Sequence, residues 1–295
     1  MNAFKRFLRK YWVVFAVVLS LAAVLTWSAG GSLIGGILSC AITALINYEI
    51  LKWLLPEKAT TLFCQESFRS GIKYALPYLA ATAILFALSY VRSGGLGKTI
   101  TIDLGAIITF PVVAAAEVFL ICGPILHLMM NRFARDDVGV FCSVLYTGLV
   151  YGVAYFAYSC TYMVSIAGAS TIAVITQGIY IALSTMFLAT IYLCTENFFL
   201  VLAARIVGAL LERGMEIFTQ DAVNLTTLTG LTRTDCIIIL VIAAALGFLA
   251  LNFSTNVPPW DKGDWGPKKK KEKPLPMRDY RLDVHKTSRL SRKKK

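Results

Sequence analysis

Residues 138–211 read VGVFCSVLYTGLVYGVAYFAYSCTYMVSIAGASTIAVITQGIYIALSTMFLATIYLCTENFFLVLAARIVGALL, and only two of these 74 side chains, Glu196 and Arg205, are charged. As a single helix the stretch would be about 110 Å long, whereas the hydrocarbon core of a bilayer is about 30 Å thick. It therefore has to cross a membrane more than once. Three crossings fit best, at about 138–159, 162–184 and 186–211. Two crossings with a re-entrant or surface piece near 165–171 are the alternative.

Apolar runs of similar length occur on both sides of this stretch, at about 11–29, 32–55, 74–91, 104–130 and 236–253. The whole chain is 57% hydrophobic and only 16% charged, with a mean hydropathy of +0.66. Soluble domains carry about 25% charged residues, so this composition excludes a soluble enzyme and a disordered protein. The sequence predicts an all-α, polytopic transmembrane helical bundle with eight crossings, or six in the alternative.

Seven cysteines, an odd number without a Cys-x-x-Cys pair, indicate neither a disulfide framework nor a metal site. With only His127 and His285 in the chain, a histidine-ligated zinc centre is excluded. His127 is expected at the membrane interface. Because no nucleophile–base constellation is recognisable, we expect a non-enzymatic protein, and the sequence indicates no cofactor.

The positive charge is concentrated near the two ends of the chain. A basic segment at 1–10 precedes the transmembrane domain at 11–254, and residues 255–295 form a basic tail that we expect to be disordered. This tail contains 14 Lys and Arg against 5 Asp and Glu. Such a tail suits acidic protein, anionic lipid or RNA and other nucleic acid as partners. The residues predicted to dock on these partners are Lys268, Lys269, Lys270, Lys271, Arg292, Lys293, Lys294 and Lys295.

Cytoplasmic loops of membrane proteins carry an excess of Lys and Arg. The basic N-terminal segment therefore predicts a cytoplasmic N-terminus, and an even number of crossings brings the basic tail to the same side. We predict an integral multi-pass protein with both termini in the cytoplasm. A bacterial plasma membrane is favoured over the endoplasmic reticulum or another organelle membrane.

Three ionisable residues inside apolar runs form the candidate polar site: Glu117, Glu196 and Arg205. A charged side chain at the centre of a bilayer costs at least about 2.5–3.5 kcal/mol on insertion scales, which makes each a functional candidate. Arg205 lies nine residues from Glu196, too far along one helix for direct contact. It is expected to meet Glu117 from another crossing, or to reach the lipid headgroups by snorkelling. Glu117 itself either relays protons, binds a cation, acts as a general base or braces the neighbouring helices.

Two further patterns bear on packing. Gly148 and Gly152 have the GxxxG spacing that allows a second helix to approach closely. The tyrosine-rich stretch 146–162 either lines an aqueous path or ligand pocket, or serves packing and interface anchoring.

Few intramembrane polar groups and a basic tail favour a non-catalytic membrane subunit or scaffold, which docks through the tail. Its expected partners are the lipid bilayer and other membrane-protein subunits. The alternative is a transporter or channel that uses Glu117 with Glu196 and Arg205. The sequence indicates no particular small-molecule ligand.

Overall fold

The structure, a computed structural model, describes residues 11–28, 33–54, 62, 68–94, 102–134, 137–160, 170–218 and 231–255. The basic segment 1–10 and all of the tail except Thr255 lie outside these residues. In the described part all regular structure is helical. The helices are α2 (Trp12–Ser28), α3 (Leu33–Leu54), α5 (Phe68–Arg92), α6 (Leu104–Leu120), η1 (Ile121–Ile125), α7 (Leu126–Phe133), α8 (Asp137–Ser159), α9 (Thr171–Thr195), α10 (Phe198–Glu212), α11 (Gly214–Phe218) and α12 (Arg233–Ser254).

Six helical stretches in the described part are long and apolar enough to cross a membrane. They are Ile34–Trp53, Gly71–Arg92, Leu104–Phe133, Asp137–Ser159, Thr171–Thr195 and Arg233–Ser254. Their outer faces are apolar as well: Ile34 is 71% exposed and Phe248 69% exposed. Large aliphatic and aromatic side chains facing outward are typical of contact with lipid. The predicted class, a polytopic helical membrane protein, is confirmed.

Two shorter helices complete the bundle. The 17 residues of α2 include the apolar stretch Val14–Leu25, and α10 has 15 residues. At 1.5 Å per residue α10 is about 22 Å long, which is less than the hydrocarbon thickness. The described chain thus runs along the bundle in eight helical stretches, six of which reach the length of a membrane span.

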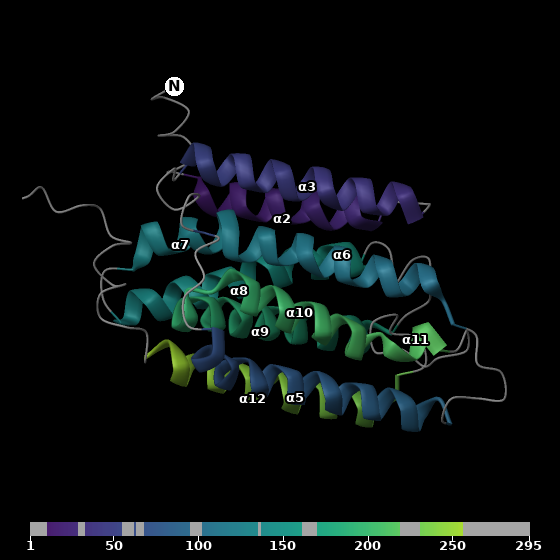
Figure 1. Cartoon of the computed structure of the whole chain (residues 1–295). Helices are drawn as coiled ribbons and strands as arrows, with labels where there is room; N and C mark the ends of the chain where they lie inside the picture. Colours follow the sequence, from purple (N-terminus) through teal and green to yellow (C-terminus); the bar gives the residue numbers. More distant parts are fainter. Residues whose placement is uncertain are drawn as a thin grey trace, which may run out of the picture.

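The helices run roughly along one common direction in three layers (Figure 1). In this view α2 and α3 lie along one side, α5 and α12 lie along the opposite side, and α6, α8, α9 and α10 fill the middle. Within the bundle α8 packs on α9, α9 on α12, and α10 on both α5 and α6. Four helices that carry polar side chains are therefore enclosed between the two outer pairs.

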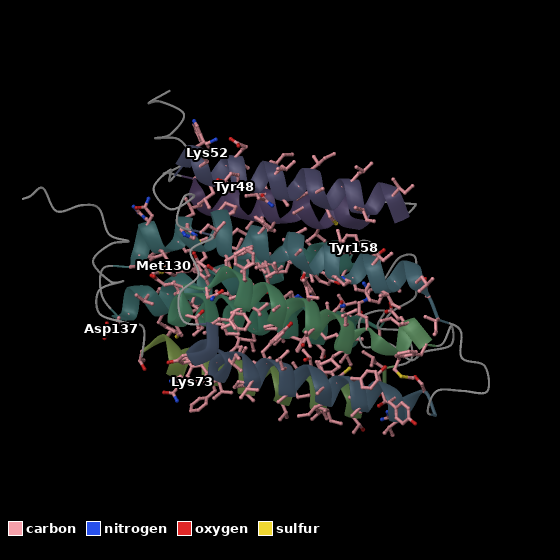
Figure 2. All side chains as sticks on the ribbon, in the orientation of Figure 1. Tyr48, Lys52, Lys73, Met130, Asp137 and Tyr158 are labelled. Carbon is pink, nitrogen blue, oxygen red and sulfur yellow. The ribbon has the colours of Figure 1, made fainter. Side chains whose placement is uncertain are left out.

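The start of α2 and the end of α12 lie at the same end of the bundle (Figure 1). Lys52, Lys73 and Asp137 lie at this end too (Figure 2). An even number of helical stretches accounts for this arrangement, because each stretch reverses the direction of the last. The start of α2 and the end of α12 therefore lie at one end of the bundle.

The predicted boundary between the last two crossings of the 138–211 stretch, at about residue 185, is wrong. The break comes at Glu196 and Asn197, between α9 and α10. Glu196 has a left-handed backbone, with φ of 47°, and ends α9. The Asn197 side chain accepts a hydrogen bond from the Leu200 amide and so caps the start of α10. The nine residues 161–169, which include most of the alternative re-entrant piece, lie outside the described part.

The predicted crossing at 104–130 forms, but it is interrupted. A π-helical turn, η1, joins α6 to α7 and contains Pro124. Proline cannot donate a backbone hydrogen bond and distorts the helix before it. His127 contacts this turn: its Nδ1 lies 2.8 Å from the Gly123 carbonyl oxygen. The His127 side chain is fully buried in the bundle and forms a hydrogen bond to the distorted turn, while its position at the membrane interface stays a prediction.

The close approach predicted at Gly148 and Gly152 is confirmed. A β-carbon at Gly152 would lie only 2.5 Å from the Ala182 β-carbon, and one at Gly148 would meet the Ala182 carbonyl oxygen. The two glycines thus bring the backbones of α8 and α9 into contact, as small residues do in membrane bundles. This contact sets the position of the polar side chains of α9 relative to those of α8.

Candidate functional site

Glu117 and Arg205 form an ion pair in the middle of the bundle. Glu117 lies near the middle of the 104–133 stretch and Arg205 at the centre of α10. The Arg205 Nε donates to Glu117 Oε2 over 2.7 Å. The Glu117 residue is only 7% exposed, and the Arg205 side chain 18% exposed. The structure thus brings together the two residues that the sequence predicts to meet.

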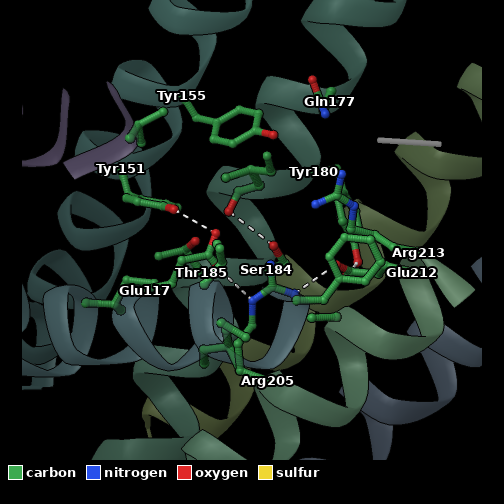
Figure 3. A pocket seen from close by; sticks show the side chains of 18 of the residues that line it. Glu117, Tyr151, Tyr155, Gln177, Tyr180, Ser184, Thr185, Arg205, Glu212 and Arg213 are labelled. Atoms are coloured by element: carbon green, nitrogen blue, oxygen red, sulfur yellow. Dashed lines mark hydrogen bonds and ion pairs between the residues drawn. The ribbon is translucent and has the colours of Figure 1, made fainter. Parts of the chain in front are cut away.

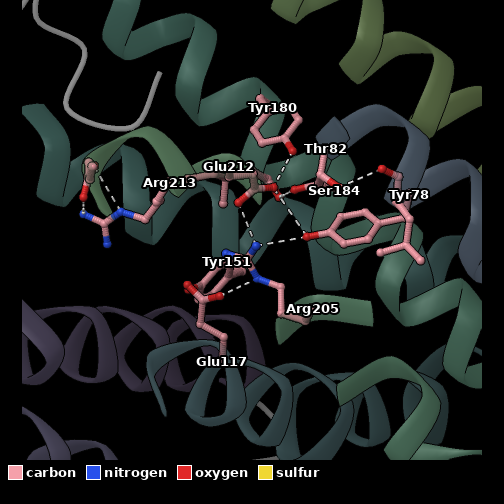
Figure 4. A network of polar contacts seen from close by, with 12 residues as sticks. Tyr78, Thr82, Glu117, Tyr151, Tyr180, Ser184, Arg205, Glu212 and Arg213 are labelled. Carbon is pink, nitrogen blue, oxygen red and sulfur yellow. Dashed lines mark hydrogen bonds and ion pairs between the residues drawn. The ribbon is translucent and has the colours of Figure 1, made fainter. Parts of the chain in front are cut away.

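A second carboxylate, Glu212, contacts the same guanidinium. Arg205 Nη1 donates to Glu212 Oε2 over 2.8 Å (Figure 4). Glu212 is the last residue of α10 and is also only 7% exposed. One guanidinium therefore joins two buried carboxylates, and we call Glu117, Arg205 and Glu212 the central cluster.

Three buried tyrosines from three helices surround the central cluster (Figure 4). Tyr151 of α8 donates to Glu117 Oε1 over 3.0 Å, and Tyr180 of α9 donates to Glu212 Oε1 over 2.6 Å. Tyr78 of α5 accepts a hydrogen bond from Arg205 Nη1 over 3.0 Å. These hydroxyls stabilise the buried charges without adding charge of their own.

Gly208 makes room for one of these tyrosines. A β-carbon on Gly208 would lie 2.6 Å from Cε1 of Tyr78 and 2.8 Å from its hydroxyl oxygen. The Tyr78 ring therefore lies directly on the backbone of α10, one turn after Arg205. Only glycine allows the ring this close, so Gly208 positions the Tyr78 hydroxyl for Arg205.

The central cluster lines a cavity of about 330 Å³ (Figure 3). Small-molecule sites in proteins are clefts of about 300–1,000 Å³, mostly apolar with a few placed polar groups. The wall here combines apolar side chains with carboxylates, guanidinium groups, hydroxyls and one amide. The polar lining residues are Thr109, Glu117, Tyr151, Tyr155, Tyr158, Gln177, Tyr180, Ser184, Thr185, Arg205, Glu212 and Arg213.

Arg213, which directly follows α10, contributes a second guanidinium to the wall of this cavity. Its Nη2 lies 3.2 Å from Glu216 Oε2, and its guanidinium lies 4.1 Å from the centroid of the Phe110 ring. The charge of Arg213 is thus paired with Glu216 and stacked on an aromatic ring. Among the described residues it forms no ion pair with Glu117 or Glu212.

The structure does not bring Glu196, the third predicted residue, into this site. Glu196 ends α9, with its amide donating to the Tyr192 carbonyl, and it is not among the residues that line the cavity. Several residues of the predicted tyrosine-rich stretch do line it, namely Tyr151, Tyr155 and Tyr158.

The predicted docking residues at 268–271 and 292–295 lie outside the described residues. Within the described part no group of three His, Cys, Asp or Glu side chains is placed to hold a metal ion.

Glu212 and the tyrosines of α5 and α9 are missing from the sequence prediction. The predicted crossing ends at residue 211, whereas α10 includes Glu212 and buries it. A signal for it exists: Arg205 and Glu212 are seven residues apart, which places them on one helical face two turns apart. Tyr78 and Tyr180 carry no such signal, because tyrosines in apolar runs more often serve packing.

Comparison of the chain with protein-family models, with curated proteins and with solved structures gave no match.

Proposed function

We propose that this protein is a membrane transporter that binds a small molecule in the cavity beside the central cluster. The observation that carries the proposal is a cavity of about 330 Å³ lined by two carboxylates, two guanidinium groups and several hydroxyls. These groups come from different helices. A small molecule in the cavity would therefore contact several helices that can move relative to one another.

The burial of the charges favours a ligand site over a purely structural role. Replacing a buried ion pair by well-packed apolar side chains is often neutral or stabilising, so helix packing alone does not require Glu117, Arg205 and Glu212. Ionisable residues inside membrane bundles typically mark ion or substrate pathways. The tyrosine hydroxyls that hold both carboxylates in place also favour a preorganised site.

An interruption within one helical stretch also supports transport. The π-helical turn η1 begins directly after α6, which carries Glu117. Substrate sites of secondary transporters are typically formed where helices are broken. Proline and π-helical turns are also common positions of helix kinks. Bending at η1 would move Glu117 relative to Arg205.

The proposal predicts that the cavity can be reached from both sides of the membrane. Thr185→Cys places a thiol on the cavity wall, and Thr171→Cys, at the exposed start of the same helix, is the matched control. Sealed vesicles of each orientation are treated with membrane-impermeant methanethiosulfonates, one bearing trimethylammonium and one bearing sulfonate. Peptide mass spectrometry distinguishes the new thiol from the native cysteines.

We expect residue 185 to be modified by at least one of the two reagents in vesicles of both orientations, and residue 171 in one orientation only. Modification of residue 185 from one side only, or from neither side, would contradict transport.

A second proposal, a non-catalytic membrane subunit that docks through its tail, is favoured by the charge of residues 255–295, where 14 basic residues face 5 acidic ones. Affinity purification in mild detergent tests it with the full chain and a chain lacking Lys268–Lys295. Loss of specific co-purifying membrane subunits with the shortened chain supports docking. Identical partners with both chains contradict it.

We also propose that both termini are cytoplasmic, in a bacterial plasma membrane. The common end of α2 and α12 with Lys52 and Lys73 (Figures 1 and 2) supports this orientation, because basic residues favour the cytoplasmic side. Protease treatment of sealed vesicles tests it: both ends must be trimmed in inside-out vesicles and both spared in right-side-out vesicles.

A further inference from the structure

The central cluster carries an excess negative charge. One guanidinium, that of Arg205, pairs with two carboxylates, those of Glu117 and Glu212. Both carboxylates are more than nine-tenths buried. An unbalanced charge in surroundings of low dielectric constant is costly unless a partner neutralises it. A positive charge entering the cavity would therefore be bound favourably.

Nearby basic side chains of the described part do not neutralise the second carboxylate of the central cluster. Arg213 is paired with Glu216 and lies on the Phe110 ring. The described residues that line the cavity include no lysine and no histidine. An anionic ligand, in contrast, would approach two carboxylates and an arginine that already donates to both.

Aromatic rings form another part of the wall. Tyr151, Tyr155, Tyr158 and Tyr180 all line the cavity. A cation within about 6 Å of an aromatic ring centroid is attracted by the ring face, and ammonium groups are often recognised this way. Carboxylates at one part of the wall and tyrosine rings at another suit an ammonium group attached to an apolar body.

The Thr185 side chain gives the wall a further polar group. It lines the cavity, and the residue is only 3% exposed. Its hydroxyl can donate to or accept from a ligand in the cavity. Figure 3 shows Thr185 on the same wall as Glu117 and Arg205.

We propose that the ligand of this cavity is a small organic cation, an amine or quaternary ammonium compound. Its positive charge lies beside Glu117 and Glu212, and its apolar part lies against the tyrosine rings. The inference rests on the proposed transport function and names its substrate class.

The test compares the rates at which two reagents of opposite charge modify Thr185→Cys in the full chain. The trimethylammonium and sulfonate methanethiosulfonates are used, and each rate is divided by its rate at Thr171→Cys. We expect the normalised rate ratio, cation over anion, to be at least about tenfold at residue 185, since unit charges a few ångströms apart interact by several kcal/mol at an intermediate dielectric constant. A ratio near one, or below one, would overturn the inference.

Variants of the central cluster and competing ions test whether its carboxylates cause the preference of residue 185 for the cationic reagent. Glu117→Gln and Glu212→Gln must each reduce the ratio, whereas Glu49→Gln, which removes an exposed carboxylate paired with Lys52, must leave it unchanged. Tetraethylammonium must slow the modification of residue 185, and benzoate at equal concentration must not. Protection by benzoate alone, or an undiminished ratio in both Gln variants, would refute the cation site.

The two proposals fail in different ways. If residue 185 reacts from both sides without charge preference, transport stands and the cationic substrate class is wrong. If residue 185 reacts with neither reagent, the cavity is closed and both proposals are wrong.

Discussion

Replacement of Arg205 by methionine is the sharpest test of how the central cluster is held together. The change keeps an unbranched apolar side chain in α10 but removes three hydrogen bonds, to Glu117 Oε2 at 2.7 Å, to Glu212 Oε2 at 2.8 Å and to the Tyr78 hydroxyl at 3.0 Å. Both carboxylates then remain buried without a cation. Removing one partner of a buried ion pair costs about 3–5 kcal/mol, and we expect the upper end because one arginine serves two carboxylates.

The free energy of unfolding of Arg205→Met should therefore fall by about 5 kcal/mol. A loss of this size lowers Tm by about 10 °C or more, at roughly 2–4 °C per kcal/mol for a chain of this size class. Thermal unfolding of the purified protein in detergent, followed by intrinsic fluorescence, measures the shift. Arg213→Met is the matched control, since its side chain is 35% exposed and paired with Glu216. A partly exposed pair contributes at most about 1 kcal/mol.

A variant without any charge in the central cluster shows whether the unpaired carboxylates cause the loss of stability. Because the loss comes from unpaired carboxylates, the triple variant Glu117→Gln, Arg205→Met, Glu212→Gln should be more stable than Arg205→Met alone. Equal Tm values for Arg205→Met and Arg213→Met would show that Arg205 does not stabilise the buried carboxylates. A triple variant that is no more stable than Arg205→Met would show that the loss does not come from unpaired carboxylates.

Gly208→Ala should displace the Tyr78 ring and lower the free energy of unfolding by about 1–3 kcal/mol. Gly36→Ala is the control, because Gly36 has open space around it and the change should not destabilise the protein. Thermal unfolding of the two variants measures the difference. Asn197→Ala should lower the free energy of unfolding by about 1 kcal/mol, because α10 loses its cap, whereas Asn197→Asp should retain most of the cap's stabilisation. Equal stabilities of the Ala and Asp variants would contradict the capping role. Deletion of Lys268–Lys295 should weaken binding to vesicles containing anionic lipid and remove its salt dependence, as measured by vesicle flotation against neutral vesicles.

The membrane class and the Glu117–Arg205 contact could be predicted because an apolar chain has few places for charge. Ionisable side chains are rare and costly in lipid, so two of opposite charge in different crossings are expected to pair. The close contact at Gly148 and Gly152 follows from small side chains at helical spacing. These predictions rest on the chemistry of the bilayer and need no knowledge of how the helices are arranged.

Other parts of the site could not be predicted, because they depend on how the helices are arranged. Glu212 is the last residue of its helix, and hydropathy does not separate a buried helix end from the polar segment that follows. Glu196 and Asn197 interrupt an apolar run with a left-handed residue and a cap, and a search for crossings of standard length overlooks such a break. Which tyrosines reach the carboxylates depends on packing contacts such as that of Tyr78 on Gly208.

A cryo-EM map of the full chain in lipid nanodiscs with tetraethylammonium would show whether the cavity holds an organic cation. We expect density for the ammonium ion inside the cavity, beside Glu117 and Glu212 and within about 6 Å of a tyrosine ring centroid, with Arg205 joining both carboxylates. A cavity filled by side chains, or a tetraethylammonium ion found only at the bilayer surface, would contradict this expectation.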